Sequence, residues 1–391
     1  MNKTLILILL LAVMSCDKSI TKLEFEKSAQ EIIDDNMLAG FSVAVFDKDS
    51  IYYSKGFGKS RIKNEIKYKK DTRQIVASIS KTIIAISIMK AQELGLINLD
   101  DDINKHLPFK IINPYFPDEI ITIRQLTNHT SSIKYSELIS GDYAFSKPEL
   151  SLREFCENYL SQEGEWYKNE NFHQTKPGLQ YDYSNIAATL VAYIIENESG
   201  ISYREFTEKY IFSPMNLKST NWFIKSQDGN NTAELYELNF SEGRFDNVES
   251  KPIGIYPVRD LTTNIYDLCK IGQMVLNNGT FRNKEILSEA SVKEMLSSNL
   301  AKKTKGVEYI GQGVFWVIDK NQLGVSSKVI GHSGGDEGIF TMFWINQKTK
   351  VGYLLLSNTG KSEHNVGALI YLWRSLNNYG KSIKKTDDYN G

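Results

Sequence analysis

The arrangement that most constrains the fold is strand-like sequence at both ends of the chain, with helical sequence between. Two runs near the N-terminus, separated by a short polar segment that favours a turn, are rich in β-branched and aromatic side chains and predict a hairpin. Three runs near the C-terminus have the same character. Strands so distant in sequence can share one sheet if the chain leaves it and returns. The predicted strands are residues 40–46, 51–57, 309–318, 338–345 and 351–357.

Helical periodicity fills the middle of the chain and also flanks the strands at each end. We therefore predict an α+β fold, in which both chain ends build an antiparallel sheet and the terminal helices cover it. A mostly helical subdomain is inserted over about residues 82–296. A cleft is expected where this insertion meets the sheet. The predicted helices are residues 25–37, 121–127, 186–199, 203–211, 265–277 and 365–376.

Composition and charge restrict the classes of partner. The 391 residues are 41% hydrophobic, which is enough for a large core. The 46 basic and 47 acidic residues give a formal net charge of -1 without a long run of one sign, so no nucleic-acid partner is predicted. The three cysteines and five histidines lack zinc-site spacing, so no zinc site is predicted.

The first residues have the pattern of an export signal. A short basic start precedes an apolar run, residues 4–14, that is too short to span a bilayer comfortably. The junction Ser15-Cys16 resembles the lipobox of bacterial lipoproteins, which implies lipidation of Cys16 and a membrane anchor facing the periplasm or the cell exterior. Plain export with a chance cysteine is the alternative. The predicted order is a signal peptide (1–15), a tether (16–23), one domain (24–378) and a polar tail (379–391).

A serine and a lysine three residues apart open an unusually apolar helical segment. A helix that begins near Ser78 places Ser78 and Lys81 on one face of its first turn. Serine becomes a nucleophile when a base takes its proton, and lysine is such a base only when its pKa is lowered by burial or nearby cations. Residues 82–89 are apolar around nearly the whole helix, so Lys81 is expected inside the protein. For an isolated Ser-x-x-Lys, a capped helix with a solvated lysine is the alternative.

Two further motifs follow in the chain. Tyr183 and Asn185 precede another apolar helix, and taken alone they indicate only a turn with a helix cap. Residues 331–335, Gly-His-Ser-Gly-Gly, are predicted as a turn beside a strand, whose glycines permit close approach of the backbone to a ligand. Alone, this would be a tight turn. In the order Ser-x-x-Lys, Tyr-x-Asn, His-x-Gly, the three motifs predict one site.

With these motifs, the chain resembles the serine hydrolases related to class C β-lactamases, which include D-alanyl-D-alanine carboxypeptidases, D-aminopeptidases and esterases. The resemblance covers roughly residues 24–375 and includes segments 95–101, 121–131 and 213–217. It implies a β-lactamase/transpeptidase-like fold. The Ser-x-x-Lys motif is typical of β-lactamases and penicillin-binding proteins.

The resemblance also implies a role for each motif residue. Ser78 would be the nucleophile, Lys81 its partner in proton transfer, and Tyr183 the general base or acid. Asn185 would orient the substrate and Lys81. The backbone N–H groups of Ser78 and Gly335 would form the oxyanion hole. The implied substrate-binding residues are Asn185, His332, Ser333, Gly334 and Gly335.

Three positions depart from the family pattern. His332 stands where many relatives carry the lysine of Lys-Thr-Gly, and a histidine with an ordinary pKa of about 6.5 supplies at best a partial charge for a substrate carboxylate. Ser132 stands where glycine is usual after His-Thr-Ser, and Arg259-Asp260 where Gly-Gly is frequent. The His-x-Gly form is closer to the peptidase and esterase branches than to dedicated β-lactamases.

The function predicted from these features is that of an exported serine hydrolase, which forms an acyl-enzyme on an ester, amide or peptide without a metal or cofactor. The alternatives are a β-lactamase or D-alanyl-D-alanine carboxypeptidase, and a non-catalytic homologue that binds cell-wall peptides. The expected partners are a small-molecule or peptide substrate and a membrane.

Overall fold

The computed structural model describes residues 19–135, 150–222, 231–249, 253–301, 304–306, 310–319, 323, 325 and 327–387. The predicted signal peptide and Cys16 lie outside these residues. Within them, no helix is both long and apolar enough to cross a bilayer.

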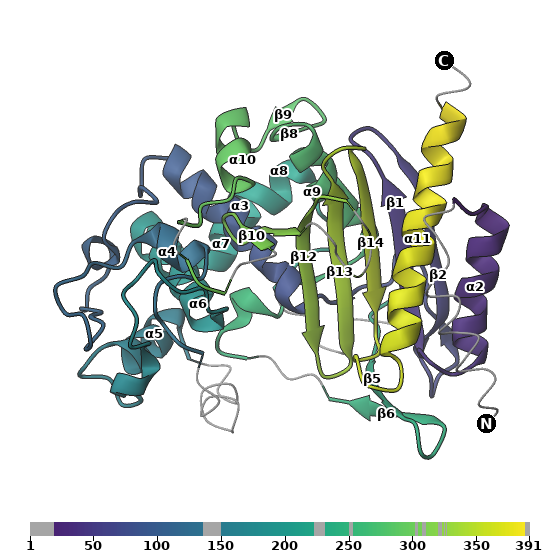
Figure 1. Cartoon of the computed structure of the whole chain (residues 1–391), viewed down its shortest axis with the longest axis horizontal. Coiled ribbons are helices and arrows are strands. Elements are labelled where there is room, and N and C mark those ends of the chain that lie inside the picture. Colours follow the sequence, from purple (N-terminus) through teal and green to yellow (C-terminus); the bar gives the residue numbers. More distant parts are fainter. Residues whose placement is uncertain are drawn as a thin grey trace.

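An antiparallel sheet of eight strands forms the centre of the molecule (Figure 1). The N-terminal hairpin joins the C-terminal strands through the pairing of β1 with β14, from Phe41↔Ser357 to Phe46↔Gly352. The prediction of one sheet built from both chain ends is therefore confirmed. In order across the sheet the strands are β10 (Ile310–Gln312), β11 (Val317–Asp319), β12 (Val329–Asp336), β13 (Ile339–Asn346), β14 (Val351–Ser357), β1 (Gly40–Phe46), β2 (Ile51–Arg61) and β3 (Ile66–Lys67).

The strand predictions needed two corrections. Residues 309–318 do not form one strand, because the chain reverses at Gly313, whose amide bonds to Trp316 O at 2.9 Å, and so separates β10 from β11. The segment 331–335, predicted as a turn, lies inside β12. Its glycines allow close packing, because a Cβ on Gly334 would lie only 2.3 Å from Val76 O. The turn comes after Asp336, where Gly338 has a φ of +69°.

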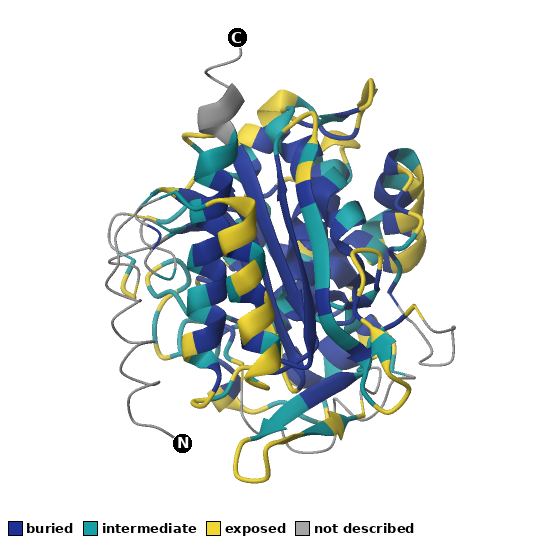
Figure 2. Ribbon diagram, turned by 90° about the vertical axis from the view of Figure 1, so that its right-hand side faces the viewer, coloured by how far each residue is buried: buried dark blue, intermediate teal, exposed yellow. Residues whose placement is uncertain are grey.

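The two terminal helices, α2 (Lys22–Asp34) and α11 (Val366–Asp387), cover one face of the sheet. Figure 2, which views this face, shows their outer residues exposed and the strands behind them buried. The helix predicted to end at residue 376 continues to Asp387, because Tyr379 still packs in this core, in contact with Phe25 and Tyr53. The first part of the predicted polar tail is thus helical.

The helical insertion lies on the other side of the sheet (Figure 1). Its central helix, α3 (Ser80–Glu93), is buried at every position from Ser80 to Met89, as its all-round apolar sequence predicts. It packs against α6 (Asn185–Ser199), and α9 (Ile265–Leu276) rests on β1 and β14. Among the described residues, the other helices of four or more residues are α4 (Ile123–Thr127), α5 (Leu152–Leu160), α7 (Tyr203–Thr207), α10 (Glu289–Met295), the 3-10 helix Ile103–His106 and the π-helical turn Glu208–Phe212.

Short elements complete the chain. They are α8 (Ser213–Met215), the 3-10 turns η1 (Ala77–Ile79), η4 (Asn169–Asn171) and η6 (Tyr256–Val258), and the strand pairs β4 (Gln74–Ile75) with β7 (Thr262–Thr263), β5 (Leu235–Asn239) with β6 (Arg244–Val248), and β8 (Thr280–Phe281) with β9 (Lys284–Glu285).

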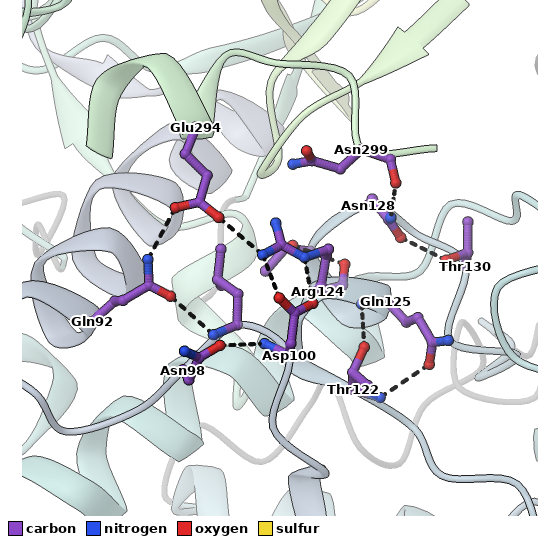
Figure 3. A network of polar contacts seen from close by, with 12 residues as sticks. Gln92, Asn98, Asp100, Thr122, Arg124, Gln125, Asn128, Thr130, Glu294 and Asn299 are labelled. Atoms are coloured by element: carbon purple, nitrogen blue, oxygen red, sulfur yellow. Dashed lines mark hydrogen bonds and ion pairs between the residues drawn. The ribbon is translucent and has the colours of Figure 1, made fainter. Parts of the chain in front are cut away.

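A polar network around Arg124 ties the helical insertion together (Figure 3). Arg124 donates two hydrogen bonds to Asp100, at 2.6 and 2.9 Å, and one to Glu294 of α10 at 2.9 Å. Close by, Asn128 accepts from Thr130 and donates to Asn299 O. The network joins two segments of the family resemblance, 95–101 and 121–131, and so fixes the loop that carries His129.

Candidate active site

Ser78 lies in the 3-10 turn η1, immediately before α3 begins at Ser80. The α-helix therefore starts at Ser80, two residues later than predicted, because the chain enters it through a 3-10 turn. Side chains three residues apart lie on one face of a helical turn, here across the junction of η1 and α3. This brings Lys81 Nζ to 3.0 Å from Ser78 Oγ, the proximity that the motif predicted.

Lys81 is fully buried. Its Nζ donates to Ser78 Oγ and, at 3.2 Å, to Val258 O, and it lies 5.0 Å from the centre of the Tyr183 ring. Desolvation lowers the pKa of Lys81 well below 10.5. A neutral amine at this distance can accept the proton of the Ser78 hydroxyl.

Tyr183 approaches Ser78 from the other side of the site, just before α6. Its hydroxyl donates to Ser78 Oγ at 3.0 Å. Burial raises the pKa of Tyr183, so the phenol keeps its proton at neutral pH. The resemblance implies that Tyr183 is either the general base or the general acid. A phenol that keeps its proton favours the general acid for Tyr183, which leaves Lys81 as the general base.

His129 supports Tyr183 and was not identified as a site residue from the sequence. Its ring centre lies 4.6 Å from that of Tyr183, and its Nδ1 accepts the Ser184 amide at 3.2 Å. Burial and the nearby Lys81 lower the pKa of His129 well below 6.5, so it is neutral. The only sequence signal for it was its place in segment 121–131.

Asn185 is the first residue of α6. Its side chain hydrogen-bonds Tyr135, and its Oδ1 is buried without a hydrogen-bond partner in the described part of the chain. The expected contact of Asn185 with Lys81 is not among the hydrogen bonds of the described residues.

Strand β12 brings the third motif to Ser78 along one face of the sheet. His332 pairs in register with Phe343, whose side chain is in the core on the insertion side. A Cβ on Gly334 would lie 3.1 Å from Ser78 N, so the two backbones are directly apposed. Gly335 has open space beside it. The amides of Ser78 and Gly335 therefore lie on apposed segments, as a two-amide oxyanion hole requires.

Ser333, predicted to bind substrate, has its hydroxyl directed elsewhere. Trp344 donates its indole N–H to Ser333 Oγ at 3.1 Å, and Trp344 packs in the core beneath the terminal helices. Successive side chains of a strand point to opposite faces. The structure thus brings His332 and Gly334 to the Ser78 side, and the Ser333 side chain to the other.

His332 is buried and neutral. Its Nδ1 lies 2.6 Å from the Ser333 carbonyl oxygen, so Nδ1 carries the proton and donates it. Burial, followed by the nearby Lys81, lowers the pKa of His332 to about 3. Its Nε2 is therefore an acceptor, buried and without a hydrogen-bond partner among the described residues.

The Ser132 departure has a backbone explanation. Ser132 has a φ of +67°, the left-handed region that glycine enters without strain. Its Oγ accepts a hydrogen bond from Asn113 Nδ2 at 2.9 Å, which partly offsets the strain of a residue with a side chain in this conformation. The glycine usual at this position in the family is explained by the same conformation.

Other features give no metal or competing site near Ser78. In the part of the chain that the structure describes, no cluster of three or more His, Cys, Asp or Glu could hold a metal ion. Cys156 and Cys269 are buried, and burial raises the pKa of both thiols. A cavity of about 670 Å³ lies away from the site, between α9, α10 and strands β10 to β13.

The fold and this three-motif site define a family. The chain belongs to the Beta-lactamase family, whose sequence profile matches residues 25–377. It is 24% identical over 338 residues to Protein flp of Staphylococcus aureus strain N315, covering 86% of this chain and 62% of that protein. It is also 24% identical to Penicillin-binding protein 4* of Bacillus subtilis strain 168, covering 80% of this chain and 67% of that protein.

A solved structure confirms the fold. The octameric penicillin-binding protein homologue from Pyrococcus abyssi superposes with a TM-score of 0.73 at 24% identity, covering 90% of this chain and 75% of the other. The predicted α+β, β-lactamase/transpeptidase-like class is therefore correct. The chain spans less than two thirds of the length of the Flp proteins, so whole-protein properties of those relatives do not transfer directly.

Proposed function

We propose that this protein is a serine hydrolase that forms an acyl-enzyme at Ser78 and acts on uncharged esters or amides. One observation carries the proposal: Lys81 Nζ and Tyr183 OH each lie 3.0 Å from Ser78 Oγ. A serine flanked by a neutral buried amine and a protonated phenol has both a proton acceptor and a proton donor beside its nucleophilic oxygen.

The residues divide the reaction as follows. Neutral Lys81 accepts the proton as Ser78 Oγ attacks the substrate carbonyl carbon. The amides of Ser78 and Gly335 hold the resulting oxyanion. Tyr183 donates its proton to the leaving group, and Lys81 returns a proton to the phenolate. A water molecule then attacks the acyl-enzyme with the same assistance and frees Ser78.

The charges around Ser78 favour neutral substrates. Burial lowers the pKa of three basic side chains around the site, Lys81, His129 and His332, and so disfavours their charged forms. His332 presents an acceptor nitrogen where a lysine would present a cation. A substrate carboxylate thus finds no fixed positive charge from these groups, whereas a neutral ester loses nothing.

The decisive test compares substrates on one preparation. We expect rapid hydrolysis of p-nitrophenyl butyrate, slow or absent hydrolysis of cephalosporins, and feeble cleavage of a D-alanyl-D-alanine peptide. Labelling by a fluorophosphonate should vanish in Ser78→Ala. Efficient peptide cleavage with weak ester hydrolysis would establish the carboxypeptidase instead. Failure of both the fluorophosphonate and a fluorescent penicillin to label would favour the non-catalytic binding protein.

We propose also that the protein is exported and anchored through a lipid on Cys16, on the strength of the apolar run 4–14 and the lipobox-like junction. A single acyl chain binds membranes only marginally, and stable anchoring requires two signals or chains. Cys16→Ala should move the protein from the membrane fraction into soluble or unprocessed form. A wild-type protein already in the soluble fraction would contradict the lipid anchor.

A further inference from the structure

Arg259 stands where the family resemblance makes Gly-Gly frequent, and it pairs with carboxylates of two segments, Asp260 and Asp336. It follows Val258, whose carbonyl accepts from Lys81 Nζ at 3.2 Å. Its guanidinium, with a side chain only 17% exposed, donates Nη1–H to Asp260 at 2.7 Å and Nε–H to Asp336. Asp260 is itself buried and accepts the Ile253 amide at 3.0 Å. Arg259 thus pairs with the buried carboxylate of Asp260 through Nη1 and with Asp336 of β12 through Nε.

Asp336 is the residue after Gly335 and opens the turn between β12 and β13. Its Oδ1 accepts the Glu337 amide at 2.9 Å, while its Oδ2 pairs with Arg259. On the other side of the turn, Glu237 of β5 accepts the Gly338 amide at 2.6 Å. The tip of this hairpin is therefore held by two carboxylate contacts, one of them to Arg259.

The same hairpin is packed against the segment of the nucleophile. Ile339, at the start of β13, packs in a small buried cluster with Leu235 and with Ala77, the neighbour of Ser78. Thr341 of β13 donates to Val76 O at 2.9 Å. Because these contacts dock the hairpin on η1, a displacement of its tip changes the distance between the two oxyanion-hole amides.

We propose that Arg259 is a positioning residue that sets the Gly335 amide in the oxyanion hole by gripping Asp336. The inference rests on the proposed acyl-enzyme function. It deepens that function, because a single segment, Val258 with Arg259, then fixes both the proton acceptor Lys81 and the oxyanion-binding strand. The Arg259 guanidinium pairs with two carboxylates of the protein, Asp260 and Asp336, and through Asp336 it can hold the backbone of β12 in place.

The test measures kcat and KM for p-nitrophenyl butyrate and the rate of fluorophosphonate labelling in Arg259→Met, Asp336→Ala and the double variant. Arg153→Met serves as the matched control, because it removes an exposed arginine–carboxylate pair (Arg153–Glu157, 3.3 Å) on α5. Misplacement of a reacting group by about 1 Å costs about a hundredfold in rate. We therefore expect kcat and labelling to fall by about tenfold to a hundredfold in both single variants, with KM nearly unchanged.

The double variant should be no slower than Arg259→Met, since both single variants remove the same Arg259–Asp336 contact. Arg259→Lys keeps a positive charge that can form one ion pair. It should therefore recover part of the kcat that Arg259→Met loses. If Arg259→Met fails to fold, Asp336→Ala still decides, because it leaves the buried Arg259–Asp260 pair in place. A raised KM with intact kcat, additive losses in the double variant, or behaviour like Arg153→Met would overturn the inference. An unreactive wild-type protein would instead refute the proposed function, and this inference with it.

Discussion

The hydroxyl of Tyr183 donates a hydrogen bond to Ser78 Oγ across 3.0 Å, although the two residues lie 105 positions apart in the chain. Ser78 comes from the 3-10 turn before α3, and Tyr183 from the loop before α6. The packing of α3 against α6 brings these two helix starts together. The packing of these two helices therefore places Tyr183 beside the Ser78 oxygen. For a substitution at the site, the effect on the reaction and the effect on the stability of the fold can be measured separately.

Lys81→Met should stop the chemistry while it stabilises the fold near neutral pH. Loss of a positioned base is expected to slow acylation by at least about a hundredfold. Because burial lowers the folded-state pKa of Lys81 well below 10.5, folding releases a proton at pH values between that folded-state pKa and 10.5. Wild-type stability should therefore rise with pH toward 10.5, and the variant should lack this rise. Thermal unfolding between pH 6 and 9 measures it; a variant less stable than the wild type at pH 7 would contradict the prediction.

Tyr183→Phe should discriminate between leaving groups. The phenol is protonated at neutral pH because burial raises its pKa, so it serves as a proton donor. An alkyl ester or amide needs that proton and should lose at least about a hundredfold in kcat/KM, within the range of general acid catalysis. A p-nitrophenyl ester, whose leaving group departs as the anion, should lose much less. Equal losses on the two substrates would assign Tyr183 a role other than leaving-group protonation.

His332 should not appear in the pH profile of ester hydrolysis near neutrality. Its pKa of about 3 keeps it neutral throughout that range. His332→Gln should cost less than the hundredfold that marks general acid–base catalysis. The depressed pKa also predicts that stability is lost as pH falls from about 6.5, the ordinary histidine pKa, toward 3, since only the unfolded chain binds the proton there. The variant should show a flatter acid limb. An activity loss with an apparent pKa between 6 and 7 that disappears in His332→Gln would contradict this.

Ser132 should tolerate glycine better than alanine. Ser132→Ala keeps the left-handed backbone strain and loses the bond from Asn113, which costs about 0.5–1.5 kcal/mol. Ser132→Gly loses the same bond but relieves about 1 kcal/mol of strain, so it should be near neutral. Urea unfolding of both variants decides the order. An alanine variant as stable as the glycine variant would show that the backbone strain is not significant.

Much of this protein was determined by its sequence alone. Strand-like runs at both ends predicted the shared sheet because a strand pattern is local, and the all-round apolar segment after Lys81 predicted a buried helix for the same reason. The Ser78–Lys81 proximity was predictable because residues three apart on one turn must meet. The segment 309–318 was predicted as one strand, although Gly311-Gln312-Gly313 interrupts its apolar residues. The reversal depends on the bond from the Gly313 amide to Trp316 O, which the strand pattern did not predict.

Only the tertiary structure decided which charges and faces the site presents. The sequence placed His332 and Ser333 together, but the pleat of β12 sends one side chain toward Ser78 and the other toward Trp344. His129 and Arg259 are positioned by partners more than fifty residues away in the chain, Ser184 and Asp336. No local sequence pattern encodes such contacts. The pKa values of Lys81 and His332 depend on how completely water is excluded from them. The exclusion of water arises from long-range packing of the helical insertion against the sheet, so it depends on the tertiary structure.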